Sequence, residues 1–280
     1  MLILECPQYD IWQVHQFRDT ERGDKGFGST GGTVAAAKVI LNTQHTNDKN
    51  FKYDINPELT AKQQVQLENL LNEFRKTTMA TSFEEIEGEH PLFYHNIDTG
   101  DAKPIYSRAR PLPRAREEWL NEELRRMEKA GIIKETQSPW ASPIVITTKK
   151  SDTPGEFVPR LCVDYRRLND ITKKDRQPLP NIDHVLATLG NGPKYFTSLD
   201  LFAGYHQIGM TPEAIERSAF ITPRSTYVYL RMPFGLCNTP ATFQKAMNEI
   251  FGNIINRWMM VYVDNIIIFN KTFTEYLEAL

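Results

Sequence analysis

The stretch Val261–Asn270, VYVDNIIIFN, places one carboxylate, Asp264, between two apolar runs, and the amide Asn265 follows it directly. A lone acid is costly to bury inside a strand. Asp and Asn tolerate turn conformations well, and two β-rich runs around an Asp-Asn dipeptide are typical of a tight hairpin. The pattern therefore predicts a β-hairpin within Trp258–Phe269 that carries Asp264 at its tip.

A second carboxylate, Asp200, follows a short apolar strand, YFTSLDL, at Tyr195–Leu201. Two strand-end carboxylates that converge form a hard-cation site, suited to Mg²⁺ held between the protein and substrate phosphates. Two-metal phosphoryl transfer needs such a pair, because one ion activates the attacking hydroxyl and the other stabilises the leaving oxygens. Either Asp alone is better explained as a solvated turn residue, so the hypothesis depends on the pair and its surroundings.

The neighbouring segments predict a mixture of strands and helices. Two further strands are expected at Ala141–Thr148 and Phe157–Tyr165, joined by a loop, Lys149–Glu156, with the Asp-Thr-Pro-Gly chemistry of a hairpin. Helical periodicity begins near Leu59, again after Pro113, and again behind an Asn/Thr cap with Pro240 in the first turn. The expected core faces are, in order, Leu67, Leu70, Leu71 and Phe74; Leu120, Leu124 and Met127; and Phe243, Met247, Ile250 and Phe251.

Composition sets limits on the class of protein. The chain has 280 residues and a net charge of −2, which argues against a small protein that coats nucleic acid but not against an enzyme with a locally basic groove. Basic charge is concentrated at residues 103–150, with 11 Lys and Arg against 6 Glu; a solvated helix face is the simpler explanation for Arg125 and Arg126.

The three cysteines and the lack of a membrane-length apolar run favour an intracellular protein. Cys6, Cys162 and Cys237 lie far apart without a Cys-x-x-Cys pair, so we expect reduced thiols that bind no metal. The cytoplasm is the default location, with a virus-like particle or the nucleus as alternatives. Residues 1–55 are polar and irregular and predict a flexible linker or inter-domain segment. The formal GxGxxG at Gly26–Gly32 lacks the strand that a dinucleotide fingerprint needs. Residues 56–96 predict a helical lead-in.

Seven motifs follow one another in a specific order along the chain. They are SPWASPIVITTKK from Ser138, RLCVDYRRLN from Arg160, RQPLPNID from Arg176, YFTSLDLFAGYHQI from Tyr195, AFITP from Ala219, MPFGLCNTPATFQ from Met232 and YVDNIIIF from Tyr262. Together they resemble the reverse transcriptase of gypsy-like LTR retrotransposon polyproteins, across residues 97–280. The resemblance implies an α+β fold, the fingers and palm of a right-hand polymerase, with an antiparallel palm sheet and flanking helices.

This resemblance also implies an activity, cofactors and partners. The domain would add deoxynucleotides to a primer 3′-hydroxyl on an RNA or DNA template, using two Mg²⁺ ions, with Mn²⁺ as an alternative. Asp200 and Asp264 would hold the metals, with the backbone carbonyl of Leu201 as a further ligand. The partners would be primed template and deoxynucleoside triphosphates, without a membrane, and either a homodimer or the rest of a polyprotein stays open.

Several other residues acquire roles through the same resemblance. Lys149 or Lys150, together with Arg160, would clamp the triphosphate, and the amides of Phe202 and Ala203 would face it. The remaining expected contacts are Tyr205 as a gate under the sugar, Phe234 and Gly235 along the incoming base and template, and Trp140 to Pro143 against the template. A solvated hairpin for the lysines and a plain core role for Tyr205 are the alternatives. Gln207 and Arg166 fit a structural hydrogen-bonding role equally well, and His206 is expected to be structural because Mg²⁺ prefers oxygen ligands.

The chain departs from the family pattern at two points. The family has two acids at the hairpin turn, whereas this chain has Asp264 and then Asn265, which removes one negative charge beside the metals. We expect catalysis to be weaker by about 10²-fold or more, and a decayed relic that at most binds nucleic acid is the alternative. The second departure is the end of the chain soon after the hairpin, which predicts neither thumb nor ribonuclease H domain. A metal-dependent nuclease would need more clustered acids than the sequence offers.

Overall fold

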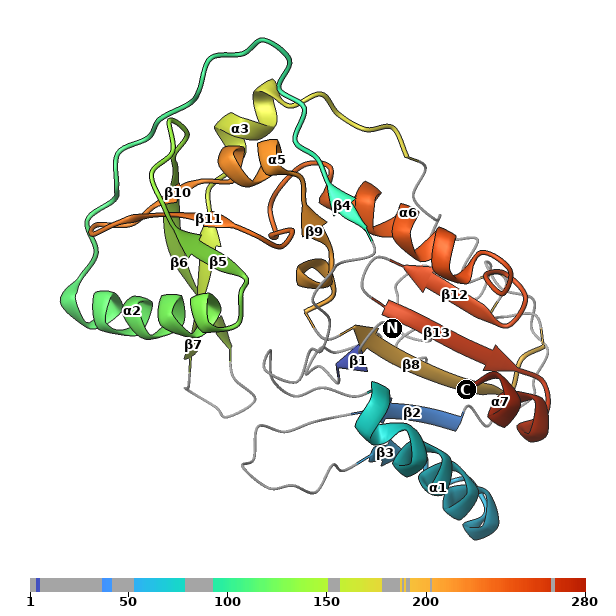
Figure 1. The fold of residues 1–280 in the computed structure, drawn as a ribbon. Coiled ribbons are helices and arrows are strands. Elements are labelled where there is room, and N and C mark those ends of the chain that lie inside the picture. Colours follow the sequence, from blue (N-terminus) through green and yellow to red (C-terminus); the bar gives the residue numbers. More distant parts are fainter. Residues whose placement is uncertain are drawn as a thin grey trace, which may run out of the picture. The chain divides into compact units, whose positions relative to one another are not determined.

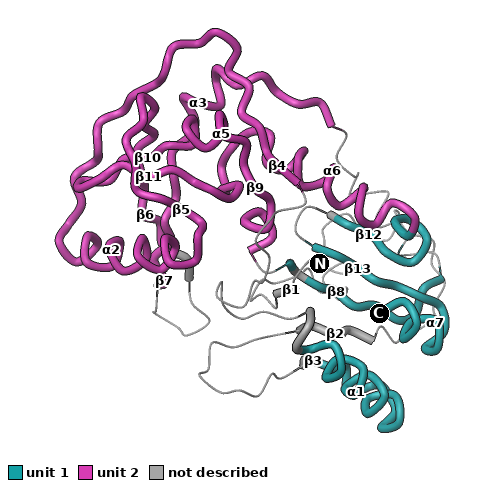
Figure 2. Tube along the Cα trace, in the orientation of Figure 1, with its two compact units in different colours: residues 1–81, 180–202, 254–280 teal, residues 82–179, 203–253 magenta. Residues whose placement is uncertain are grey.

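The computed structural model describes residues 4–5, 37–41, 53–78, 93–150, 157–177, 187, 189, 192–201, 203–262 and 265–280 of the chain. These residues form an α+β fold (Figure 1), as the sequence predicts. They divide into two compact units, residues 1–81, 180–202 and 254–280 in the first and residues 82–179 and 203–253 in the second (Figure 2). Both units are discontinuous in sequence, whereas the predicted boundaries at residues 55 and 96 follow the chain; that domain assignment stays a prediction.

The first unit is built on a sheet of six strands. Its order is β12-β13-β8-β2-β3, and β1 also pairs with β8. The bounds are β1 Leu4–Glu5, β2 Ala37–Leu41, β3 Tyr53–Ile55, β8 Tyr195–Leu201, β12 Met259–Tyr262 and β13 Asn265–Asn270. The strand at 195–201 and the hairpin are therefore confirmed. Strands β1, β2 and β3 all lie where the sequence predicted an irregular segment, because short strands lacking a clear period are hard to recognise without their pairing partners.

Helices α1, Ala61–Thr78, and α7, Phe273–Ala279, belong to the same unit. In α7, Thr272 caps the first turn and Glu275 completes a capping box. Tyr276 is fully buried and its hydroxyl bonds to Thr197 on β8, so α7 is fixed to the central strand. In α1, Leu67 and Leu71 are buried as predicted, but Phe74 is 46% exposed.

The second unit contains a five-stranded sheet in the order β5-β11-β10-β6-β7. Its strands are β5 Ile133–Glu135, β6 Ser142–Lys150, β7 Phe157–Val163, β10 Phe220–Ile221 and β11 Thr226–Tyr229. A separate pair joins β4, Tyr94–His95, to β9, Gly209–Met210. The predicted strand–loop–strand pattern is confirmed by the antiparallel β6–β7 pair, whose loop lies outside the described residues.

Four α-helices and a 3₁₀ turn complete the described part of the second unit. They are α2 Arg114–Lys129, α3 Arg166–Ile171, the 3₁₀ turn Gly204–Gln207, α5 Pro212–Arg217 and α6 Thr239–Phe251. The predicted faces of α2 and α6 are buried at Leu120, Leu124, Met127, Phe243 and Met247. Ile250 is 37% exposed, so that part of the predicted core face is wrong. No described helix has the length and apolar character needed to cross a membrane.

Candidate active site

The first unit places the backbone of Asp200 on a central strand, opposite residue 265. In the antiparallel β13–β8 ladder, Asn265 pairs with Asp200, Ile266 with Leu199 and Ile267 with Ser198. Asn265 also pairs with Tyr262 at the end of β12, so it is the first residue of β13 and not part of the connection. The predicted hairpin is thus present. Its second strand, β13, starts at Asn265, one residue earlier than a turn centred on Asp264 and Asn265 would give. Opposed Cα atoms in such a ladder are about 4.5–5.5 Å apart.

The second predicted acid, Asp264, lies outside the described residues, as do Phe202 and the side chain of Asp200. Asp264 is nevertheless the chain neighbour of Asn265, so the ladder brings the two acid-bearing segments to the same end of adjacent strands. Leu201 also pairs with Leu4 of β1 on the other edge of β8. Within the described residues, no three His, Cys, Asp or Glu side chains gather as a metal site. The catalytic and metal assignments therefore stay predictions.

All of the predicted nucleotide-binding residues except Phe202 lie in the described part of the second unit, and three of them, Arg160, Phe234 and Tyr205, are in contact. The Arg160 guanidinium on β7 lies 5.2 Å from the centroid of the Phe234 ring, a cation–π distance. Phe234 is 42% exposed, and its ring is 4.8 Å from that of Tyr205, centroid to centroid. Tyr205 is buried and packs in turn on Phe243 of α6 at 5.2 Å. A column of tilted and edge-on ring contacts therefore connects the core of this unit to an exposed ring and a permanent positive charge.

Two residues that are close in sequence to members of this column have positive φ angles. Gly235 has φ of +91°, a conformation open mainly to glycine, and its carbonyl accepts a hydrogen bond of 2.8 Å from Asn169 Nδ2. Ala203 has φ of +45°, which is uncommon for a residue with a Cβ, and its carbonyl accepts from the amide of His206 at 2.7 Å. Ala203 is therefore the strained residue of the two, and non-glycine residues in this conformation cluster at functional sites.

The remaining predicted contacts fall into two groups. Lys149 and Lys150 end β6, and only their backbone is described. Trp140, 6% exposed, and Pro143 are both buried. The assignment of these two residues to a template contact stays a prediction.

His206 is held as a neutral, structural side chain. Its Nδ1 lies 3.1 Å from the carbonyl oxygen of Met232, and its ring stacks on Tyr229 and meets Phe234 edge-on. Burial lowers its pKa to about 4, against an ordinary value of 6.5. A ring held in this way is not available as a ligand without breaking its contacts, in line with the structural role expected for it.

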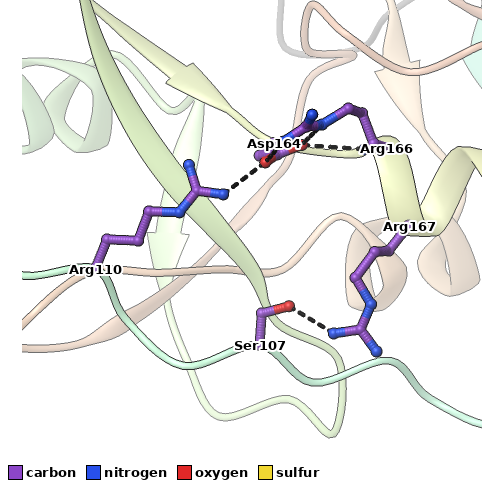
Figure 3. A network of polar contacts seen from close by, with 5 residues as sticks. All are labelled: Ser107, Arg110, Asp164, Arg166 and Arg167. Carbon is purple, nitrogen blue, oxygen red and sulfur yellow. Dashed lines mark hydrogen bonds and ion pairs between the residues drawn. The ribbon is translucent and has the colours of Figure 1, made fainter.

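A polar network at the start of α3 was not predicted from the sequence (Figure 3). Asp164 accepts hydrogen bonds of 2.7 Å from both Arg166 and Arg110. The Arg166 guanidinium, with Arg110 beside it, holds the pKa of the Asp164 carboxyl well below its usual range. Arg110 and Asp164 are far apart in sequence, so no local pattern signals the contact.

Comparison with known proteins agrees with these features. Residues 148–280 match the family model for reverse transcriptase (RNA-dependent DNA polymerase). The Retrovirus-related Pol polyprotein from transposon 297 of Drosophila melanogaster is 42% identical over 226 residues, covering 79% of this chain and 21% of that protein. The chain carries a reverse transcriptase domain of the gypsy-like retrotransposon type.

This reverse transcriptase domain has further relatives in sequence and in fold. The Pol polyprotein from transposon gypsy of Drosophila melanogaster is 38% identical over 183 residues, covering 65% of this chain and 18% of that protein. The chain thus spans about a fifth of the length of the curated relatives it matches. The foamy viral protease-reverse transcriptase in complex with an RNA/DNA hybrid aligns with a TM-score of 0.63 at 23% identity, over 79% of this chain and 28% of that one. This similarity confirms the predicted fold class.

Proposed function

We propose that this chain is the catalytic part of an RNA-directed DNA polymerase, which adds a deoxynucleotide to a primer 3′-hydroxyl and releases pyrophosphate. The observation that carries the proposal is the register of β8 and β13, in which Asp200 is opposite the residue that directly follows Asp264. A pair of acids at one end of adjacent strands is the minimum arrangement that can bridge two divalent cations. The family match and the RNA/DNA hybrid bound by the fold relative support the same reaction.

The donors available at this strand end suit magnesium. Asp200, Asp264 and the Leu201 carbonyl offer oxygen alone, the ligand type that Mg²⁺ and Mn²⁺ prefer. The backbone of Leu201 pairs with Leu4 of β1, and this pairing competes with metal binding by the Leu201 carbonyl. We therefore assign the two aspartates as the principal ligands. When bound, the metal ions would activate the primer hydroxyl and neutralise charge on the phosphates. Asn265 contributes an amide in place of a second carboxylate on β13.

The second unit supplies groups suited to the nucleoside triphosphate. Arg160 is a permanently charged fork that matches phosphate geometry, and its position over the Phe234 ring limits the directions it can take. The exposed Phe234 ring presents a flat apolar surface of the kind on which a base stacks. Tyr205 packs between Phe234 and Phe243, and in this proposal its bulk would exclude a 2′-hydroxyl.

Single-turnover primer extension with the 280-residue chain tests this proposal. The chain would be mixed in excess with a primed RNA or DNA template, one deoxynucleoside triphosphate and Mg²⁺. We expect Asp200→Asn and Asp264→Asn each to lower the extension rate by about 10²-fold or more, because each removes a metal ligand. Asp101→Asn, which neutralises an exposed acid outside the site, is the matched control and should leave the rate unchanged.

The Asn265→Asp variant separates the polymerase from a decayed relic. Restoring the second acid should raise the extension rate by about 10²-fold, because it returns a negative charge to the metal site. Equal rates for the unchanged chain and this variant would contradict our reasoning about Asn265. Binding of primed template without extension by either protein would favour the relic. Cleavage of a duplex without added nucleotide would instead indicate a nuclease.

A further inference from the structure

Residues 232–237, MPFGLC, form a loop between β11 and α6 in the second unit, and this loop carries the exposed Phe234 ring. The loop contains no helix or strand of its own, so no regular ladder of hydrogen bonds fixes its backbone. Backbone polar groups in such a segment need partners from elsewhere in the fold. The side chains that provide these partners therefore decide where the Phe234 ring is held.

Asn169 of α3 holds the second half of the loop through both polar atoms of its side-chain amide. Its Nδ2 donates to the Gly235 carbonyl at 2.8 Å, and its Oδ1 accepts from the Cys237 amide at 2.9 Å. Asn169 is half-buried, and it lies 66 positions from Gly235 in the sequence. The two bonds fix this half of the loop to α3.

Thr239 and His206 hold the first half of the loop. Thr239, the first residue of α6, is 1% exposed, and its Oγ1 donates to the Pro233 carbonyl at 3.1 Å. His206 Nδ1 lies 3.1 Å from the Met232 carbonyl oxygen, and a carbonyl only accepts, so this ring nitrogen carries the proton. The carbonyls immediately before and after residue 234 are therefore each bonded to a side chain from another element.

The Phe234 ring is surrounded on several sides and still accessible. The His206 ring meets it nearly at right angles, at 83° and 5.7 Å between centroids, and the Tyr205 ring lies 4.8 Å away. The Arg160 guanidinium lies 5.2 Å from its centroid. The ring nevertheless remains 42% exposed. An accessible ring that is fixed through its backbone and its neighbours is preorganised to receive a flat ligand.

We propose that Asn169 and Thr239 are positioning residues of the nucleotide site, which hold the Phe234 ring where it receives a deoxynucleoside triphosphate. Neither side chain would touch the nucleotide. Without its bonds the loop would sample other positions, and the apparent dissociation constant would rise as the fraction of molecules with the ring in place falls. The inference rests on the proposed function in one respect: the ligand is the deoxynucleoside triphosphate of the polymerase.

A fluorine label on the ring measures its position and its response to nucleotide without any chemical step. With 4-fluorophenylalanine at position 234, the ¹⁹F NMR signal reports the surroundings of the ring, and titration with dTTP in the absence of primer gives a dissociation constant. We expect Thr239→Val to move the signal and to raise this constant by about 2- to 13-fold, the range for net loss of one hydrogen bond. Thr239→Ser, which keeps the hydroxyl, should match the labelled parent chain.

Asn169→Ala removes two hydrogen bonds and should raise the dissociation constant by at least as much as Thr239→Val. Asn121→Ala is the matched control, because Asn121 is also half-buried on a helix of the second unit. Far-UV circular dichroism checks that each variant folds, and the two Thr239 variants decide if Asn169→Ala does not. Equal effects of Asn169→Ala and Asn121→Ala would overturn the proposal. So would a displaced ring signal with an unchanged dissociation constant, or no response of the labelled parent chain to dTTP.

Single-turnover incorporation on a primed template separates this inference from the proposed function. Asn169→Ala and Thr239→Val should raise the dTTP concentration for half-maximal rate and leave the maximum rate unchanged, because binding is weakened and the chemical step is not. A lower maximum rate at an unchanged half-maximal concentration would overturn the positioning role. If both variants weaken dTTP binding and no protein extends a primer, the inference is supported and the polymerase proposal fails. If the parent chain extends a primer and both variants keep its dTTP affinity, the polymerase proposal is supported and this inference fails.

Discussion

His95 provides a stability prediction whose size follows from the structure. The side chain is 1% exposed, and its Nδ1 lies 2.8 Å from Thr242 Oγ1 on α6. Its strand, β4, pairs with β9, and the Thr211 amide donates to the His95 carbonyl at 3.0 Å. Burial lowers the pKa of His95 to about 4, so the ring is neutral in the native state at every pH near neutrality.

The sign and size of the pH effect follow from this difference in pKa. In the unfolded chain the pKa of His95 is 6.5, so between pH 6.5 and pH 4 the unfolded state binds a proton that the native state does not. Stability due to His95 is therefore complete above pH 6.5, falls as the pH is lowered and levels off below pH 4. We expect a loss of about 2 kcal/mol at pH 5 and about 3 kcal/mol below pH 4.

Urea unfolding of the unchanged chain and of His95→Gln at several pH values between 7.5 and 5 measures this contribution. His206 titrates in the same range, so the variant is needed to isolate His95. The stability difference between the two proteins should shift by about 2 kcal/mol in favour of the variant as the pH falls to 5. NMR titration of the His95 ring gives the native pKa directly. A ring that titrates near 6.5, or a stability difference independent of pH, would refute the reasoning.

Three further predictions concern the candidate site. Phe234→Leu should raise the KM for the deoxynucleoside triphosphate by about 2- to 30-fold, the range for loss of one cation–π contact, whereas Phe234→Tyr should leave the KM unchanged. Steady-state incorporation measures both values. A KM for Phe234→Leu equal to that of the unchanged chain would contradict the role of the ring. Gly235→Ala, at φ of +91°, should lower unfolding stability by about 1–3 kcal/mol and by more than Gly131→Ala, at φ of +66°, as measured by urea unfolding. Asn265→Asp should lower the unfolding free energy by about 0.2–1 kcal/mol in the absence of metal, because the new carboxylate is opposite Asp200, and Mg²⁺ should restore the lost stability. Thermal melting in the presence of a chelator measures this effect. An unchanged melting temperature would argue against repulsion between residue 265 and Asp200.

The sequence predicted elements that have a strong local pattern. Strand β8 occupies the predicted residues 195–201, and α2 buries the predicted Leu120, Leu124 and Met127. In both cases the apolar period is set by neighbouring residues, and tertiary packing uses the same face. At Asn238 the local pattern predicted the start of the helix correctly but not the role of the side chain. This residue does precede α6, but its side chain donates to the Lys173 carbonyl and accepts from the Asp175 amide instead of capping the helix.

The sequence could not predict contacts between distant segments. Nothing near Arg160 indicates that its guanidinium lies over Phe234, because the two residues come from different elements and meet only in the folded unit. The burial of Trp140 and Pro143 likewise depends on tertiary packing and not on a local pattern. The register of Asn265 with Asp200 also depends on pairing between strands, and the hairpin pattern alone placed Asn265 one residue too far into the turn.

In the proposed metal site, Asn265 occupies a strand position where metal binding and folding would make opposite demands. A carboxylate at 265 would be opposite Asp200 and next to Asp264, and three negative charges at one strand end repel one another unless cations are bound. Asn keeps the ladder and an oxygen donor while it removes one of these charges, so the metal-free fold is more stable. In the proposed site the same change would weaken the attraction for cations. The Mg²⁺ concentration for half-maximal extension should therefore be higher with Asn265 than with Asn265→Asp, and an identical Mg²⁺ requirement would mean that residue 265 lies outside the field of the metals.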